Sequence, residues 1–170
     1  MEECSNRIMP NSPLSTYLND HLAGSTGVVN LLVDLQQTKP DGTQLEDFLT
    51  RLRDDLIADR ATLEGIMQML QVQKQRHRTA SAWLIEKLGK RKFRSDNPED
   101  ANLQLLEALE LVETGIEGKR ELWRSLAATT EQLRPLKGIN FDHLIQRAEE
   151  QHERVEAVRV ETAKTALAPT

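Results

Sequence analysis

Residues 44–72 read QLEDFLTRLRDDLIADRATLEGIMQMLQV, and their apolar residues recur every three or four positions. This period matches the roughly 3.6 residues of an α-helical turn. Thr43 precedes the stretch and is a residue type that caps helices, while Glu46 and Asp47 lie near the positive end of the helix dipole. The stretch therefore predicts an amphipathic helix over about 44–72, with one apolar face that must pack against other helices.

Similar apolar stripes occur on both sides of this stretch, separated by strong turn signals. The signals are KPDG at 39–42, SDNP at 95–98 and PLKG at 135–138, the last followed by Asn140, which is a helix-capping residue. We therefore predict three further long helices, over about 14–37, 98–130 and 141–168.

The connection between the second and third of these helices has a different composition. Residues 74–94 contain eight Lys or Arg and one acidic residue, a net charge of +7, whereas the whole chain carries -5 and its remainder therefore -12. Ala80, Trp83, Leu84 and Leu88 keep helical spacing, which predicts an additional helix ending near Gly89. The basic segment is expected to be a solvated helix that pairs with acidic neighbours, and contact with nucleic acid, an acidic membrane surface or another protein is the alternative.

Helical hairpins at each end of the chain and a long connection between them predict an all-α fold. Residues 14–168 are expected to form an antiparallel four-helix bundle with the additional crossover helix, an arrangement that resembles ferritin-like folds. Residues 1–13 contain Pro10 and Pro13 and show no periodicity, so they predict a flexible N-terminal arm.

Several classes of protein lack support in this sequence. Cys4 is the only cysteine, which excludes an intramolecular disulfide, and no uncharged apolar run of about 18 residues is present. The acidic N-terminus is not followed by a signal-peptide core, so we expect a cytoplasmic protein without a transmembrane segment. Phosphate-binding, dinucleotide-binding, nucleophile-elbow and nucleic-acid-binding motifs are missing. Whether the chain is an enzyme stays open, and a homodimer formed through an exposed helix face fits the pattern.

Polar residues on the apolar stripes are the candidates for function, because a helix turns by about 100° per residue and these side chains point toward the core. One such residue lies on each predicted helix: His21, Asp59, Glu113 and His152. Counted in residues from the turn at 39–42, His21 and Asp59 lie at the same height of the bundle. Counted from the turn at 135–138, Glu113 and His152 also lie at similar heights. If the two helical hairpins dock in register, all four side chains lie in one layer. Asn19 is predicted to point away from the core, and Gln151 lies at a margin of its stripe.

Buried carboxylates require protons, basic partners or a cation, and imidazole and carboxylate ligands suit Zn, Fe or Mn. The pattern resembles the ferritin-like di-metal carboxylate proteins, which carry an inward Glu on two helices and Glu-x-x-His on the other two. Glu149 and His152 match the second motif by spacing. The resemblance implies metal binding by His21, Asp59, Glu113 and His152, with Asp55, Glu117 and Glu149 as second choices.

A metal-free interpretation explains the same residues. His21 and Asp59 would form one buried hydrogen-bonded pair, and Glu113 or Asp55 would offset the inward Arg159. Two function classes therefore stand side by side: a ferritin-like metal-binding protein, and a helical interaction or structural protein without a cofactor. A small-molecule pocket or catalysis is the third possibility.

Two further features of the sequence concern packing and resemblance. Gly24, Gly27, Gly115 and Gly118 lie inside predicted helices, where each costs about 1 kcal/mol relative to Ala, so we expect close helix approach there. The segments YLNDHLAG at 17–24, EGK at 117–119 and LW at 122–123 resemble segments of bacterial helical proteins of unassigned function, and they imply no activity.

Overall fold

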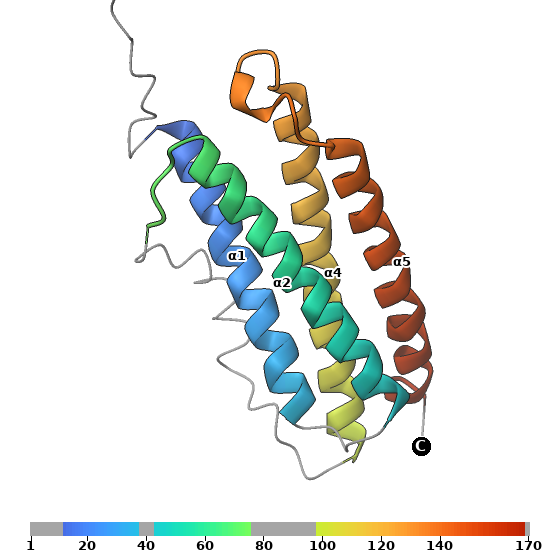
Figure 1. The fold of residues 1–170 in the computed structure, drawn as a ribbon. Helices are drawn as coiled ribbons and strands as arrows, with labels where there is room; N and C mark the ends of the chain where they lie inside the picture. The colour runs from blue at the N-terminus through green and yellow to red at the C-terminus, as the bar shows by residue number, and fades with distance from the viewer. Residues whose placement is uncertain (1–11, 38–42, 76–97, 169–170) are drawn as a thin grey trace, which may run out of the picture.

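The computed structural model describes residues 12–37, 43–75 and 98–168, and every regular element in these ranges is helical. The elements are α1 (Pro13–Gln37), α2 (Gln44–Met69), α4 (Pro98–Ala128), the short 3-10 helix η1 (Arg134–Leu136) and α5 (Phe141–Ala166) (Figure 1). The all-α prediction is confirmed for these residues. Most of the predicted N-terminal arm and of the additional crossover helix lies outside the described residues.

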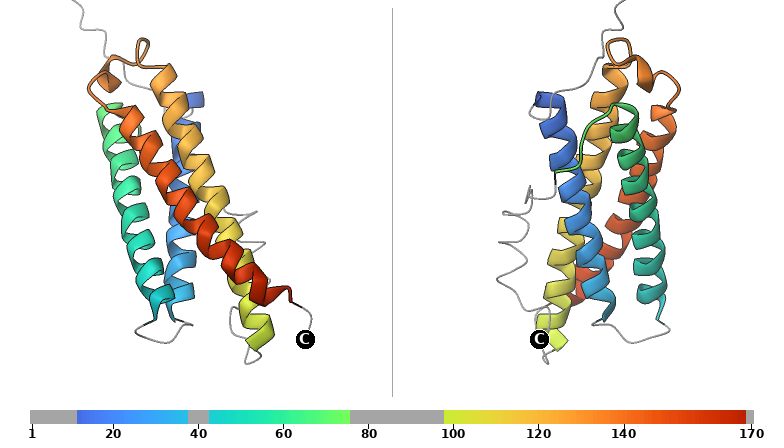
Figure 2. Two further views of the ribbon diagram at one scale, coloured as in Figure 1. Left: turned by 90° about the vertical axis from the view of Figure 1, so that its right-hand side faces the viewer. Right: turned by 60° about the vertical axis from the view of Figure 1, so that its left-hand side comes forward.

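The four long helices lie side by side as a bundle (Figures 1 and 2). α1 packs against both α2 and α4, and α4 packs along α5. α1 and α2 run in opposite directions, as do α4 and α5, whereas α2 and α4 run the same way. In the described part of the chain no helix is both long enough and apolar enough to cross a membrane.

Side-chain caps start the helices where the sequence predicts them. The Thr43 hydroxyl accepts a hydrogen bond from the Glu46 amide at 3.1 Å, and the Asn140 side chain accepts one from the His143 amide at 3.0 Å. The first helix begins at Pro13, one residue earlier than expected, because the Ser12 hydroxyl accepts a hydrogen bond from the Ser15 amide at 3.1 Å.

α2 ends at Met69, three residues before the predicted end. Gln71 adopts a left-handed conformation with φ of 55°. The amides of Gln71 and Val72 donate hydrogen bonds to the carbonyls of Gln68 and Met67, at 3.0 and 2.8 Å, which closes the helix in the Schellman pattern. The prediction missed this end because a glutamine, and not a glycine, occupies the left-handed position.

The hydrophobic core is divided into two clusters along the bundle axis. One cluster is centred on buried leucines near the α1–α2 turn, including Leu32, Leu52 and Leu109. The other surrounds Trp123 near the opposite end and includes Leu18, Ile66, Leu126 and Phe141. Between the clusters lie buried polar residues of α2 and α5, Asp59 at 3% and Gln151 at 0% exposure.

Glycines in the helices do not all serve close packing. A Cβ atom on Gly115 would lie 2.5 Å from Cγ2 of Val28, so the absence of a side chain lets α4 approach α1. Cβ atoms on Gly24 and Gly118 would meet nothing within 4 Å. The prediction of close approach is therefore confirmed at Gly115 and wrong at Gly24 and Gly118, which face open space.

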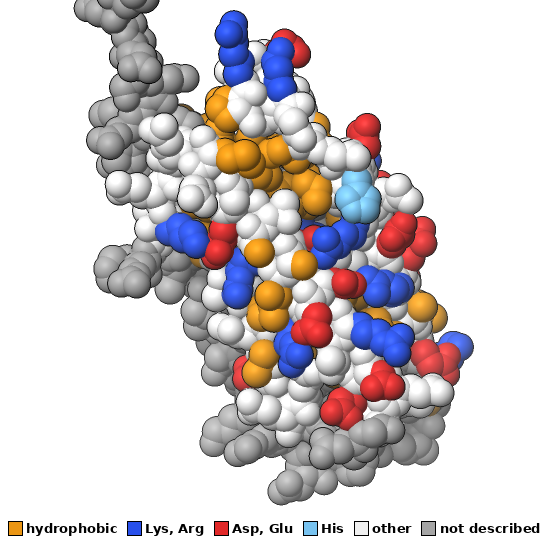
Figure 3. Space-filling model, viewed as in Figure 1, with side chains coloured by type: hydrophobic (Ala, Val, Ile, Leu, Met, Phe, Trp, Pro, Cys, Tyr) orange, Lys and Arg blue, Asp and Glu red, His pale blue; other side chains and the backbone are white. Residues whose placement is uncertain are grey.

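The outer face formed by α2 and α5 is mainly polar. Figure 3 shows acidic and basic side chains interspersed along it, with hydrophobic side chains gathered toward its upper end. Met69, at the end of α2, is 47% exposed. The mixed charges indicate a solvated surface along most of these helices.

Candidate functional site

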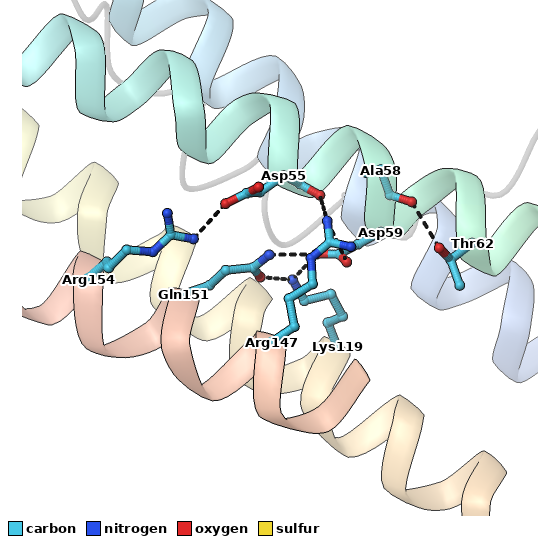
Figure 4. Close-up of polar contacts among 8 residues, drawn as sticks. All are labelled: Asp55, Ala58, Asp59, Thr62, Lys119, Arg147, Gln151 and Arg154. Carbon is cyan, nitrogen blue, oxygen red and sulfur yellow. Dashed lines mark hydrogen bonds and ion pairs between the residues drawn. The ribbon is translucent and has the colours of Figure 1, made fainter. Parts of the chain in front are cut away.

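Asp59 is the centre of a buried polar layer that joins three helices. It lies on the apolar face of α2, between Leu56 and Leu63, so its carboxylate points into the bundle. The predicted inward direction of Asp59 is therefore confirmed. Three side chains converge on this carboxylate, Lys119 from α4 and Arg147 and Gln151 from α5 (Figure 4).

The contacts of Asp59 are short. Lys119 Nζ lies 2.5 Å from Asp59 Oδ2 and Arg147 Nη2 lies 3.2 Å from Oδ1. Gln151 Nε2 donates to Oδ2 at 2.9 Å, and Lys119 also donates to Gln151 Oε1. One buried carboxylate thus has two cationic partners, and each polar atom of the Gln151 amide has a partner within the layer.

Two additional contacts extend the layer toward solvent. Arg147 Nη2 donates to the backbone carbonyl of Asp55 at 2.9 Å, and Arg154 Nη2 lies 2.5 Å from Asp55 Oδ2. These long side chains connect α5 to α2 across the bundle. Asp55, a second-choice metal ligand, is therefore engaged by an arginine.

Burial changes the acid–base behaviour of Lys119. Its side chain is 13% exposed. Burial lowers the pKa of the Lys119 ammonium, and the neighbouring Asp59 carboxylate offsets part of this decrease. The structure thus holds a lysine that releases its proton more readily than an exposed one.

A cavity of about 510 Å³ adjoins the polar layer, between α1, α2 and α4. Its apolar wall includes Val28, Leu63 and Trp123, and Asp59 and Lys119 also line it. Gly24 and Gly118 belong to its lining as well, and both face open space, as described above. The cavity exists in part because these two helical positions carry no side chain.

His21 lines the same cavity from α1 and packs edge-to-face against Tyr17, with ring centroids 4.6 Å apart. Burial lowers the pKa of His21, and Asp20 opposes this decrease. The imidazole is therefore neutral near neutral pH and offers one donor and one acceptor nitrogen.

Glu113 and His152 lie elsewhere, at the contact between α4 and α5. Glu113 Oε2 is 3.3 Å from Arg159 Nε, which also lies 2.6 Å from Glu156 Oε2. Burial and then the neighbouring Glu156 raise the pKa of Glu113, and His152 acts on it electrostatically. The Glu113–Arg159 pair of the metal-free interpretation is thus present.

The predicted metal ligands are divided between two places. His21 and Asp59 adjoin the cavity, whereas Glu113 and His152 lie near Arg159. Glu117 and Glu149, which are second choices, lie 2.6 and 3.8 Å from the guanidinium of Arg120. Across residues 12–37, 43–75 and 98–168, no three His, Cys, Asp or Glu side chains are grouped to hold a metal ion. Metal binding stays a prediction.

The comparisons with known proteins add no identification. No family model, curated protein or solved structure matches this chain. The resemblance to ferritin-like proteins, the homodimer and a partner for residues 74–94 therefore stay predictions. Of that basic segment only residues 74 and 75 are described, and Lys74 Nζ lies 2.9 Å from Glu64 Oε2.

Sequence reasoning missed Lys119 and is wrong about Asn19, which is predicted to point away from the core yet is 2% exposed. Gln151, at a margin of its stripe, is 0% exposed. The Asn19 amide donates to the Gln73 carbonyl at 3.1 Å and accepts from the Gln75 amide at 2.7 Å, which fixes the chain after α2. Helical direction alone does not find such residues, because a long or amide side chain at the flank of a stripe still reaches a buried partner.

Proposed function

We propose that this chain binds a small, uncharged and mainly apolar molecule in the cavity between α1, α2 and α4. The observation that carries the proposal is the cavity of about 510 Å³ between two closely packed core clusters. Ligand sites commonly measure about 300–1,000 Å³ and bury most of the ligand surface. A mainly apolar molecule seated between these walls would bury apolar surface and gain dispersion contacts.

The character of the walls supports an apolar ligand body with a polar group. Val28, Leu63 and Trp123 offer aliphatic and aromatic surface, and the neutral His21 offers a hydrogen-bonding edge. A few polar groups on a mainly apolar wall are typical of sites that orient a small organic molecule.

The charges around the cavity support an uncharged ligand. Asp20 and Asp59 line it with negative charge, Arg60 lines it with positive charge, and the Arg147 guanidinium pairs with Asp59 from α5. Because these charges balance with Lys119 as a neutral amine, the site presents no net charge to offset the desolvation of an ion.

Isothermal titration calorimetry with a set of uncharged bicyclic aromatics, such as naphthalene-2-methanol, tests this proposal. Naphthalene-2-sulfonate is the charged control with the same rings. Gly118→Leu places a side chain in the cavity and should abolish binding. Gly65→Leu is the matched control, because a Cβ at Gly65 also meets open space and Gly65 does not line the cavity.

We expect the wild type and Gly65→Leu to bind the uncharged compounds and to bind the sulfonate more weakly. The absence of binding across the uncharged set, or equal binding by Gly118→Leu, would refute the proposal.

Metal binding is a separate hypothesis with less support, because its four candidate ligands fall in two places. Elemental analysis of the purified protein tests it, and His21→Ala or His152→Ala should release any bound metal. Metal-free protein whose stability does not change with Zn, Mn or Fe(II) would contradict it.

A further inference from the structure

We propose that Lys119 is a carbonyl-reactive amine and that the molecule admitted to the cavity is an aldehyde or ketone, which Lys119 converts to an imine. This inference rests on the proposed binding function and adds the chemical class of the ligand. It stands on the position of Lys119 between the cavity and the polar layer, next to a carboxylate that can carry a proton.

The hydrogen-bond partners of Lys119 suit a neutral amine. The amine Nζ has two acceptors in the layer, Asp59 Oδ2 and Gln151 Oε1. An ammonium has three N–H donors, whereas a neutral amine has two donors and one lone pair. The neutral form keeps two N–H donors for these two acceptors, so loss of one proton gives Lys119 a lone pair without removing either contact.

The charges around Asp59 also favour loss of the lysine proton. The guanidinium of Arg147, a permanently cationic group, lies 3.2 Å from the other oxygen of this carboxylate. If Lys119 becomes neutral, Asp59 therefore still has a cationic partner. Burial and Arg147 act in the same direction on the pKa of Lys119, against Asp59 and the more distant Asp55. Desolvated lysines next to another cation are the ones that enzymes use for imine formation.

The proposed reaction needs no oxidant or reductant. The lone pair of Lys119 forms a C–N bond with the carbonyl carbon, and the carbonyl oxygen becomes a hydroxyl as the nitrogen releases a proton through Asp59. The nitrogen then forms the C=N bond and gives its second proton to Asp59, which passes it to the departing hydroxyl. One water is released for each imine formed.

Reductive trapping of the intact protein tests the inference. The protein is incubated near neutral pH with naphthalene-2-carbaldehyde and cyanoborohydride, which reduces an imine to a stable secondary amine, and the modified lysines are found by peptide mass mapping. Lys137 and Lys164 are internal controls, because their side chains are 50% and 65% exposed. Lys119→Arg keeps the positive charge without a primary amine, and Lys137→Arg is its matched control.

We expect one adduct per chain, located on Lys119, formed faster than any adduct on the exposed lysines, and lost in Lys119→Arg and Gly118→Leu but not in Lys137→Arg. Modification of exposed lysines with Lys119 unmodified would overturn the inference, and so would a Lys119→Arg protein with the same yield. Peptide mapping of the wild type decides the question even if Lys119→Arg does not fold.

Titration with naphthalene-2-methanol separates this inference from the proposed function. This alcohol has the rings of the aldehyde but no carbonyl. If it binds and the aldehyde leaves no adduct on Lys119, the cavity binds ligands and the imine chemistry is wrong. If neither the alcohol nor the aldehyde binds, both proposals fail.

Discussion

Substitution of single glycines by alanine should separate the two roles that helical glycines play in this bundle. Gly118→Ala adds a methyl group to open space, so it should raise the free energy of unfolding by about 0.8–1.0 kcal/mol through helix propensity alone. Gly65→Ala should have the same effect, because its added Cβ also meets nothing within 4 Å.

Gly115→Ala should instead destabilise the protein. Its Cβ would lie 2.5 Å from Cγ2 of Val28, about 1 Å closer than an ordinary carbon–carbon contact. Val28 is 5% exposed and its branched side chain is stiff, so it cannot turn away easily. Overpacking of this kind costs about 1–3 kcal/mol, which after the propensity gain leaves a net loss of up to about 2 kcal/mol.

Urea denaturation followed by far-ultraviolet circular dichroism measures these differences. A double-mutant cycle with Val28→Ala isolates the contact, because removal of Cγ2 should make Gly115→Ala stabilising by about 1 kcal/mol in that background. The reasoning is refuted if Gly115→Ala stabilises the wild type as much as Gly118→Ala does. It is also refuted if the cost of Gly115→Ala persists without the Val28 methyl groups.

Three further predictions concern the polar layer, pH and the end of α2. Asp59→Ala leaves Lys119 and Arg147 without their carboxylate and should lower the free energy of unfolding, measured in urea, by about 3–5 kcal/mol. The control Asp54→Ala, at an exposed pair with Arg53, should lower it by less than about 1 kcal/mol. Similar losses for the two variants would contradict this prediction. Because burial lowers the pKa of His21 below 6.5, the unfolded chain takes up its proton first, so the stability from neutral His21 is present above pH 6.5 and is lost as the pH falls through the lowered pKa. Denaturation at about pH 7.5 and 5.5 should show a smaller loss for His21→Gln than for the wild type, by at most about 1.4 kcal/mol per pH unit, and an equal loss would exclude His21 as the cause. Gln71→Gly relieves the left-handed backbone at φ of 55°, so it should raise the melting temperature and the free energy of unfolding, the latter by up to about 1 kcal/mol. Gln68→Gly inside α2 should lower the free energy of unfolding by a similar amount. A decrease for both variants would show that the end of α2 is not strained.

The sequence by itself determined the helices of the described chain and most of their ends. Apolar residues at helical spacing define the buried faces, and Thr43, Asn140 and the proline at position 98 mark three starts. These signals are local, because a cap or a stripe depends on residues within a few turns of one helix. The inward direction of Asp59 followed from the same periodicity.

The tertiary structure decided which partners the inward residues meet. Periodicity gave Asp59 a direction but not the neighbours Lys119 and Gln151, which come from α4 and α5, about 60 and 92 residues later in the chain. It also could not distinguish Gly115, where a Cβ would clash with Val28, from Gly118, one helical turn away, where a Cβ would meet open space. The physical reason is that a helix pattern fixes the face of each residue, whereas the relative height, rotation and spacing of docked helices depend on packing across the whole bundle.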